Sequence, residues 1–201
     1  MNGTARRGAP RRDEPSARER LVATATELFY QDGIRAIGID AVLAKSGVAK
    51  STLYRTFASK DELIAAVAAE QNQRFWQWWD DVAQQNAGSP RQLVEALFAG
   101  LVEQIARPTF RGCPFINMAT ELPDRAHPAT VIACGNKQAV RQRLRELSAA
   151  MGARHPERLG NQLALLMDGA YGQAMTLGTS DLREELLSAV AQLIDGKGSQ
   201  P

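Results

Sequence analysis

The sequence predicts an all-α protein of about nine helices, and three observations lead to this fold class. Apolar residues recur at three- and four-residue spacing along most of the 201 residues, which is the period of an amphipathic helix. Serines and prolines mark helix starts, and glycines mark helix ends. No alternating strand pattern or internal repeat interrupts these segments.

The first three helices are expected to form a small N-terminal unit. Ser16 and Glu19 make a capping box before a helical stripe that ends at Asp32-Gly33. A second, short helix begins near Ile39, and Gly47 turns the chain into a third. Two short helices joined at a glycine predict a helix-turn-helix over about residues 39–57, which the longer first helix braces.

The third helix has one apolar face and one polar, basic face. A rotation of about 100° per residue turns Leu53 and Phe57 inward. The opposite face gathers cations and hydroxyls without a carboxylate, and such groups hydrogen-bond phosphates and base edges. The residues of this outer set are Lys50, Ser51, Thr52, Tyr54 and Arg55. The pattern therefore predicts double-stranded DNA as a partner.

Lys60 is placed at the start of the fourth helix by a further capping box, Ser59 with Glu62. A cation at this position opposes the helix dipole, and residues that break a local rule are often functional. Free N–H groups at a helix start favour phosphate, so Lys60 is a candidate phosphate contact. The alternative is a flexible lysine that extends into water.

Residues 33–63 resemble the DNA-binding region of the tetracycline-repressor (TetR) family of bacterial transcription regulators, and the resemblance extends back to around Ser16. It rests on residues that recur at the family's spacing: Gly47-Val48, Leu53-Tyr54, Phe57 and Ser59-Lys60. It implies that Tyr54 and Lys60 hold phosphates. It also implies that Lys50, Ser51 and Arg55 lie nearest to base edges, with Thr52 able to serve either role.

Two positions depart from the family pattern. Ile37-Gly38 stands where the family carries a hydroxyl before the second helix, and Ala49 stands where it carries serine before the third. Gly38 can still cap a helix, but Ala49 has no side-chain acceptor, so a weaker entry into the third helix is expected.

Charge divides the chain in the same way as the helices. Residues 1–60 hold 11 basic and 6 acidic residues, a balance of +5, whereas residues 61–201 hold 13 and 16, a balance of −3. The basic end is expected to face DNA. We expect a disordered basic arm over residues 1–15, either a minor-groove arm or a plain tail, and a DNA-binding domain over 16–62. An effector-binding and dimerisation domain over 63–196 and a tail over 197–201 follow.

The fourth helix runs from Lys60 to about Gln85 and links the two domains. Prolines at 90, 128 and 156 mark the starts of three later helices, a loop and short helix are expected around residues 112–118, and the last helix runs from about Asp181 to Asp195.

The last two helices are amphipathic and carry small residues, so packing against a symmetry mate would form a four-helix bundle, as in the family's dimers. The expected interface residues are Leu166, Ala170, Ala174, Leu186 and Val190. The alternative is that the small residues fit within the monomer.

An effector pocket is expected among aromatic and methionine side chains that would surround a central cavity in this family. These residues are Phe75, Trp79, Phe98, Phe115, Met118 and Tyr171, although such side chains are also ordinary core residues. Asp168 could meet a cationic ligand, or it could lie at a crevice edge or a partner chain.

An enzyme is not expected, and neither is a metal site or a cofactor. The two histidines, His127 and His155, each precede a helix-opening proline, and no nucleophile elbow, phosphate loop or zinc spacing is present. A thiol-based redox sensor using Cys113 or Cys134 is the alternative function, although buried cysteines are commonly inert.

The sequence therefore predicts a sequence-specific, homodimeric transcription regulator. By family habit it is a repressor that a small-molecule effector releases from its operator. No segment has the length and apolarity of a membrane span or of a signal peptide, so a cytoplasmic location without membrane contact is expected.

Overall fold

The computed structural model describes residues 14–196, and within this range the chain forms nine α-helices and no strands. The helices are α1 (Ala17–Asp32), α2 (Ile39–Ser46), α3 (Lys50–Thr56), α4 (Lys60–Gln85), α5 (Pro90–Ile105), α6 (Pro114–Glu121), α7 (Pro128–Ala150), α8 (Pro156–Leu177) and α9 (Leu182–Asp195). The predicted all-α fold class is confirmed. The arm predicted over residues 1–15 and the tail over 197–201 lie almost wholly outside the described residues.

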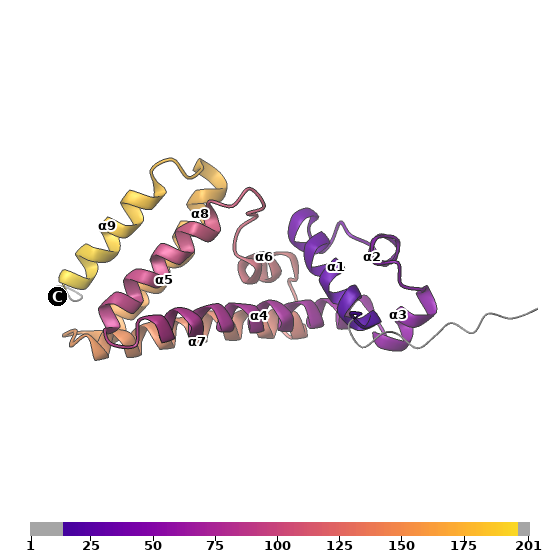
Figure 1. Cartoon of the computed structure of the whole chain (residues 1–201), viewed down its shortest axis with the longest axis horizontal. Helices are drawn as coiled ribbons and strands as arrows, with labels where there is room; N and C mark the ends of the chain where they lie inside the picture. The colour runs from indigo at the N-terminus through magenta and orange to yellow at the C-terminus, as the bar shows by residue number, and fades with distance from the viewer. Residues whose placement is uncertain (1–13, 197–201) are drawn as a thin grey trace, which may run out of the picture.

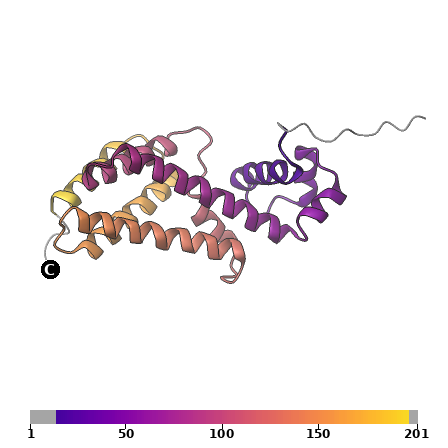
Figure 2. The same cartoon turned by 60° about the horizontal axis from the view of Figure 1, so that its bottom comes forward.

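The helices form a small unit and a larger one, joined by α4 (Figure 1). Helices α1, α2 and α3 gather at one end, where α1 contacts α2, α3 and the start of α4. The 26 residues of α4 extend about 39 Å at 1.5 Å per residue and run along α7 in the larger unit (Figure 2). The predicted domain boundary at residues 62 and 63 falls in the first turn of α4 and stays a prediction.

The predicted helix starts are present as hydrogen bonds. Ser16 Oγ accepts from Glu19 N, and Glu19 Oε2 accepts from Ser16 N, so the first capping box is complete. Ser59 Oγ likewise accepts from Glu62 N at 3.1 Å, but the Glu62 carboxylate accepts from Ala58 N instead of from Ser59 N. Neither Gly38 nor Ala49 makes a side-chain cap, as their residue types require.

The larger unit packs α7 against α4, α6 and α8, while α9 packs against both α5 and α8. Gly160 of α8 lies so close to α7 that an added Cβ would stand 2.5 Å from the backbone nitrogen of Arg145. Only glycine allows this approach, which fixes how near the two long helices lie. Within the described residues, no helix is long and apolar enough to cross a membrane.

Candidate nucleic-acid interface

The turn between α2 and α3 depends on Gly47. Its φ of 65° lies in the left-handed region, and its N–H donates to Leu43 O and so ends α2. Val48, Leu53 and Phe57 then anchor α3 to the core with 6%, 0% and 4% of their surfaces exposed. The inward residues predicted from the helical period are therefore the buried ones.

The outer face of α3 lies open. Lys50, Ser51, Tyr54 and Arg55 are exposed, and Thr52 is half-buried. Tyr54 keeps 50% of its surface exposed although it is a large aromatic residue. A short helix that presents two cations, hydroxyls and one exposed ring matches the geometry by which a helix enters the major groove.

Asp40 is a neighbour of this face that the sequence prediction missed. Its Oδ1 lies 3.2 Å from Lys50 Nζ, and both side chains are mostly exposed. The sequence places Asp40 in the first turn of α2, ten residues before Lys50, and only the turn at Gly47 brings the two together. The outer surface is thus less uniformly basic than α3 alone predicts.

Lys60 points back into the protein. Its Nζ donates to Ile34 O at 2.6 Å and lies 5.7 Å from the centre of the Phe29 ring. This lysine therefore ties the start of α4 to the turn between α1 and α2. An ammonium has three N–H donors, so the bond to Ile34 leaves two of them for another acceptor such as a phosphate.

Comparisons with known proteins agree with this geometry. Residues 21–67 match the family model described as bacterial regulatory proteins, tetR family, which spans most of α1, all of α2 and α3, and the start of α4. A TetR-family transcriptional regulator from Streptomyces coelicolor shares 31% sequence identity, a TM-score of 0.86, and coverage of 91% of this chain and 96% of its own. The chain belongs to the TetR family of transcriptional regulators.

Other TetR-family relatives show the same likeness. A TetR transcriptional regulator from Streptomyces avermitilis is 34% identical with a TM-score of 0.80, covering 91% of this chain and 98% of its own. The transcriptional repressor NemR of Escherichia coli is 26% identical over 112 residues, which are 55% of this chain and 56% of NemR. The chain thus aligns with only about half of that curated repressor.

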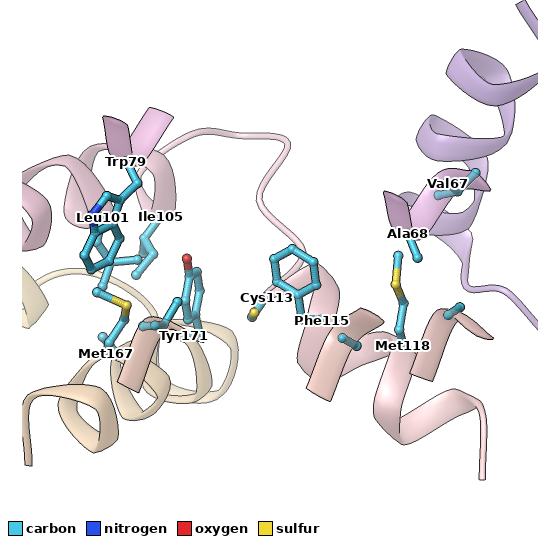
Figure 3. Packing of buried hydrophobic residues seen from close by; sticks show 14 of the residues in the cluster. Val67, Ala68, Trp79, Leu101, Ile105, Cys113, Phe115, Met118, Met167 and Tyr171 are labelled. Atoms are coloured by element: carbon cyan, nitrogen blue, oxygen red, sulfur yellow. The ribbon is translucent and has the colours of Figure 1, made fainter. Parts of the chain in front are cut away.

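The residues predicted to surround an effector pocket are mostly core residues in this TetR-family chain. Trp79, Phe98, Phe115, Met118 and Tyr171 are at most 7% exposed, and Phe75 is half-buried. Phe75 packs edge-on against Phe115 at 5.8 Å between ring centres. Figure 3 shows Trp79, Phe115, Met118 and Tyr171 among the buried apolar side chains of the larger unit.

A large hollow near these residues lies beside the core. A groove of about 700 Å³ opens between three helices, and we call it the α6–α7–α8 groove. Phe115 is the one predicted pocket residue that lines it. Tyr171 borders a different hollow of about 210 Å³, and Met118 borders one of about 20 Å³. These three predicted residues therefore border three separate hollows.

The predicted dimer residues divide between the inside and the outside of the monomer. Ala170, Leu186 and Val190 are at most 5% exposed, while Leu166 and Ala174 are half-buried. Leu186 and Val190 belong to the face by which α9 packs within the chain. Ala170 is therefore buried within the monomer, and the dimer interface stays a prediction.

Other residues of α8 and α9 remain open. Leu165 and Leu177 of α8 are 72% and 77% exposed. Gly169 and Gly172 are also exposed, and an added Cβ on either would meet nothing within 4 Å. An apolar groove of about 560 Å³ runs between the two helices and includes Leu166 and Ala170.

The two cysteines occupy different surroundings. Cys113 is buried just before α6, and Cys134 is half-exposed on α7, where it lines the α6–α7–α8 groove. Burial lowers the pKa of Lys137, but its interactions with Cys113 and Asp168 outweigh burial, and the net pKa is raised. Asp168 Oδ1 lies 2.6 Å from Lys137 Nζ, so Asp168 is already paired with a cation.

Proposed function

We propose that this TetR-family protein is a sequence-specific DNA-binding repressor that works as a homodimer and leaves its operator when a small molecule binds. The exposed polar face of α3, held in place by buried Leu53 and Phe57, is the observation that carries the proposal. Tyr54 would bond to phosphates, while Lys50, Ser51 and Arg55 would approach base edges and Thr52 either. Arginine bonds guanine at two atoms, so Arg55 favours a guanine in each half-site.

A dimer is supported by the open faces of α8 and α9. Two recognition helices must face successive turns of the major groove, about 34 Å apart, and a symmetric pair of chains provides this spacing. Exposed leucines and uncovered glycines on α8 supply an apolar surface that a second copy would bury. The two helices from each chain would then form a four-helix bundle.

Release from the operator requires a connection between the two units. Tyr30 OH donates to Gly112 O and accepts from Arg111 N, both at 2.9 Å. Arg35 N donates to Glu121 Oε2 at 3.1 Å, which ties the turn between α1 and α2 to the end of α6. A ligand that favours one position of α6 or α4 would change the spacing of the two recognition helices, and the population would shift off DNA.

Selection of duplexes from a random-sequence pool, followed by gel shifts, tests this function. Arg55→Ala should relax base preference at one position of each half-site, at a cost of about 1–3 kcal/mol for the preferred site. Tyr54→Phe should weaken all sequences alike. Arg154→Ala, a change in the exposed turn between α7 and α8, is the matched control. Recovery of no preferred sequence, or an unchanged preference after Arg55→Ala, would contradict the proposal.

A thiol sensor is the second candidate function, because the ammonium of Lys137 interacts with the Cys113 thiol. The reactive form of a cysteine is its thiolate, so the labelling rate of Cys113 is the property to measure. Rapid labelling of Cys113 by a thiol reagent, with loss of DNA affinity that Cys113→Ser prevents, would support this candidate. Slow labelling of both cysteines with unchanged DNA affinity would remove it.

A further inference from the structure

The α6–α7–α8 groove has the composition of a ligand site. Its apolar surface comes from all three helices and includes Phe115, Ile116, Ala133 and Leu165. One face of α7 adds polar groups, because residues 134, 137, 138 and 141 follow the helical period and all border the groove. Ligand pockets commonly combine such apolar walls with a few polar groups and have volumes of about 300–1,000 Å³, a range that includes this groove.

The charges of the groove do not cancel. Its charged lining residues are Lys137, Arg141 and Asp168. The Lys137–Asp168 ion pair, 2.6 Å long, neutralises two of them. Arg141 is exposed, and among residues 14–196 its guanidinium has no hydrogen-bond or ion-pair partner. One positive charge, with five N–H donors in a planar fork, is therefore available at the edge of an apolar hollow.

The α6–α7–α8 groove also differs from the apolar groove of about 560 Å³ between α8 and α9, which we call the α8–α9 groove and where we expect the second copy to bind. The α8–α9 groove is framed by two helices, and its charged lining residue is the carboxylate of Glu185. A symmetry mate that presents the same apolar faces suits that surface. In the α6–α7–α8 groove, by contrast, the unpaired guanidinium of Arg141 favours an anionic group, and the apolar walls favour a hydrocarbon body.

We propose that the α6–α7–α8 groove binds a small amphipathic organic monoanion, such as an aromatic or aliphatic carboxylate. Its carboxylate forms a bidentate bond with Arg141, and its apolar body lies against Phe115, Ile116 and Ala119 of α6. Of the residues that the sequence predicts around a central pocket, this site includes Phe115 alone. This inference deepens the proposed function, since the role of the ligand as effector rests on that function.

Helix α6 connects the groove to the DNA-binding unit. Phe115, Ile116, Ala119 and Thr120 of α6 line the groove, and the adjoining Glu121 accepts the bond from Arg35 N. The opposite side of α6 borders α1 residues, because Asn117 and Met118 share a small hollow with Phe29 and Tyr30. A ligand against α6 therefore acts on the helix that contacts α1.

Titration calorimetry of the full chain with naphthoate, and with the uncharged naphthamide of similar shape, tests the site. We expect one naphthoate to bind per chain. The affinity for naphthamide should be lower by at least about tenfold. Arg141→Gln should lower naphthoate affinity by about tenfold, and Ala119→Phe, which fills the groove from an exposed position, should abolish binding. Arg183→Gln, an exposed change on α9 outside the groove, is the control for Arg141.

Several outcomes would overturn the proposal. These are no naphthoate binding at millimolar concentration, equal binding of naphthamide, or unchanged affinity in Arg141→Gln. A dimer broken by Ala119→Phe, without naphthoate binding to the original chain, would assign the groove to a second copy. If Ala119→Phe fails to fold by circular dichroism, Arg141→Gln and naphthamide still decide the matter.

Duplex binding, followed in the same samples, separates this inference from the proposed function. If the chain binds naphthoate but no selected duplex, the ligand site is supported and the proposed regulatory function is contradicted. If the chain binds duplex but not naphthoate, the proposed regulatory function is supported and the ligand site is contradicted. If both hold, naphthoate should weaken duplex binding by the original chain and leave duplex binding by Arg141→Gln unchanged.

Discussion

Lys60 shows how one side chain can hold the DNA-binding unit together at its edge. Its ammonium is half-buried, donates to Ile34 O and lies over the Phe29 ring, so it joins α4 to the turn after α1. A cation at a helix start is unfavourable in isolation, and the carbonyl and the ring offset that cost. The unfavourable position of Lys60 at the start of α4 therefore has a structural explanation that does not depend on a bound phosphate.

Lys60→Met keeps the apolar stem and removes the ammonium. We expect the free energy of unfolding, measured in urea, to fall by about 1 kcal/mol, because a part-buried carbonyl loses its donor. If Lys60 also contacts phosphate, duplex affinity should fall for all sequences, and the slope of log affinity against log salt should become shallower by about 0.9 for each chain, or about 1.8 for a dimer. Lower stability with unchanged duplex affinity would assign Lys60 a structural role alone.

Tyr171 lies in a second residue-scale cluster, with Lys137 Nζ 5.5 Å from its ring centre. Burial raises the pKa of the Tyr171 hydroxyl well above 10.0, and Cys113 and Asp168 raise it further. The folded chain therefore holds this proton more tightly than the unfolded chain does. The resulting stability is complete below about pH 10 and is lost as the pH rises through the folded-state pKa.

Tyr171→Phe should reduce this alkaline loss of stability. We expect the free energy of unfolding of the original chain to fall by up to about 1.4 kcal/mol per pH unit and per group above about pH 10. The raised pKa values of Tyr30 and Lys137 add in the same direction, so the variant should fall less steeply but still fall. Urea unfolding from about pH 8 to pH 11 measures both slopes, and equal slopes would show that Tyr171 does not titrate differently in the two states.

At the scale of elements, the caps and turns allowed the helices and their bounds to be predicted from the sequence. Ser16, Gly47 and the helix-opening prolines are local signals, because their hydrogen bonds and backbone angles join residues close in sequence. The Lys50–Asp40 contact and the α6–α7–α8 groove were not predictable in this way. They depend on how separate helices pack, and aromatic residues look alike whether they fill a core or line a cavity.

Gly47→Ala tests the turn between α2 and α3. An added Cβ meets nothing within 4 Å, so the cost comes from the left-handed backbone alone, and we expect a loss of about 1 kcal/mol in the free energy of unfolding. Gly88→Ala is a matched control, since Gly88 has equal space and its φ lies outside the left-handed region. It should be neutral or slightly stabilising in the same urea titration. Equal effects of the two substitutions would remove the turn argument.

At the scale of the whole molecule, α8 and α9 differ in how much of their apolar surface the chain itself buries. The sequence gives α9 one apolar face, but the structure uses Leu182, Leu186, Val190 and Ile194 of that face inside the monomer. An ion pair of 2.6 Å between Arg91 and Asp195 also joins α5 to α9. A helical stripe shows that a face is buried, and it does not show whether the same chain or a partner buries it. The open glycines of α8 are the better markers of a partner.

Gly169→Glu uses this distinction. The residue is exposed with open space around it, and glutamate favours a helix more than glycine does by roughly 0.5–1 kcal/mol, so the monomer should fold. A buried carboxylate would nevertheless oppose a four-helix bundle, and analytical ultracentrifugation should show monomers where the original chain gives dimers. Duplex affinity should fall by at least about tenfold, because the two half-sites are no longer bound together.

Gly135→Glu makes the same chemical change at an exposed, open position on α7, and we expect it to stay dimeric with unchanged duplex affinity. The comparison isolates the position of the new charge from its effect on helix stability and on net charge. A Gly169→Glu variant that stays dimeric would move the interface away from this face of α8. Monomers from both variants would mean that the added charge, wherever it lies, separates the chains.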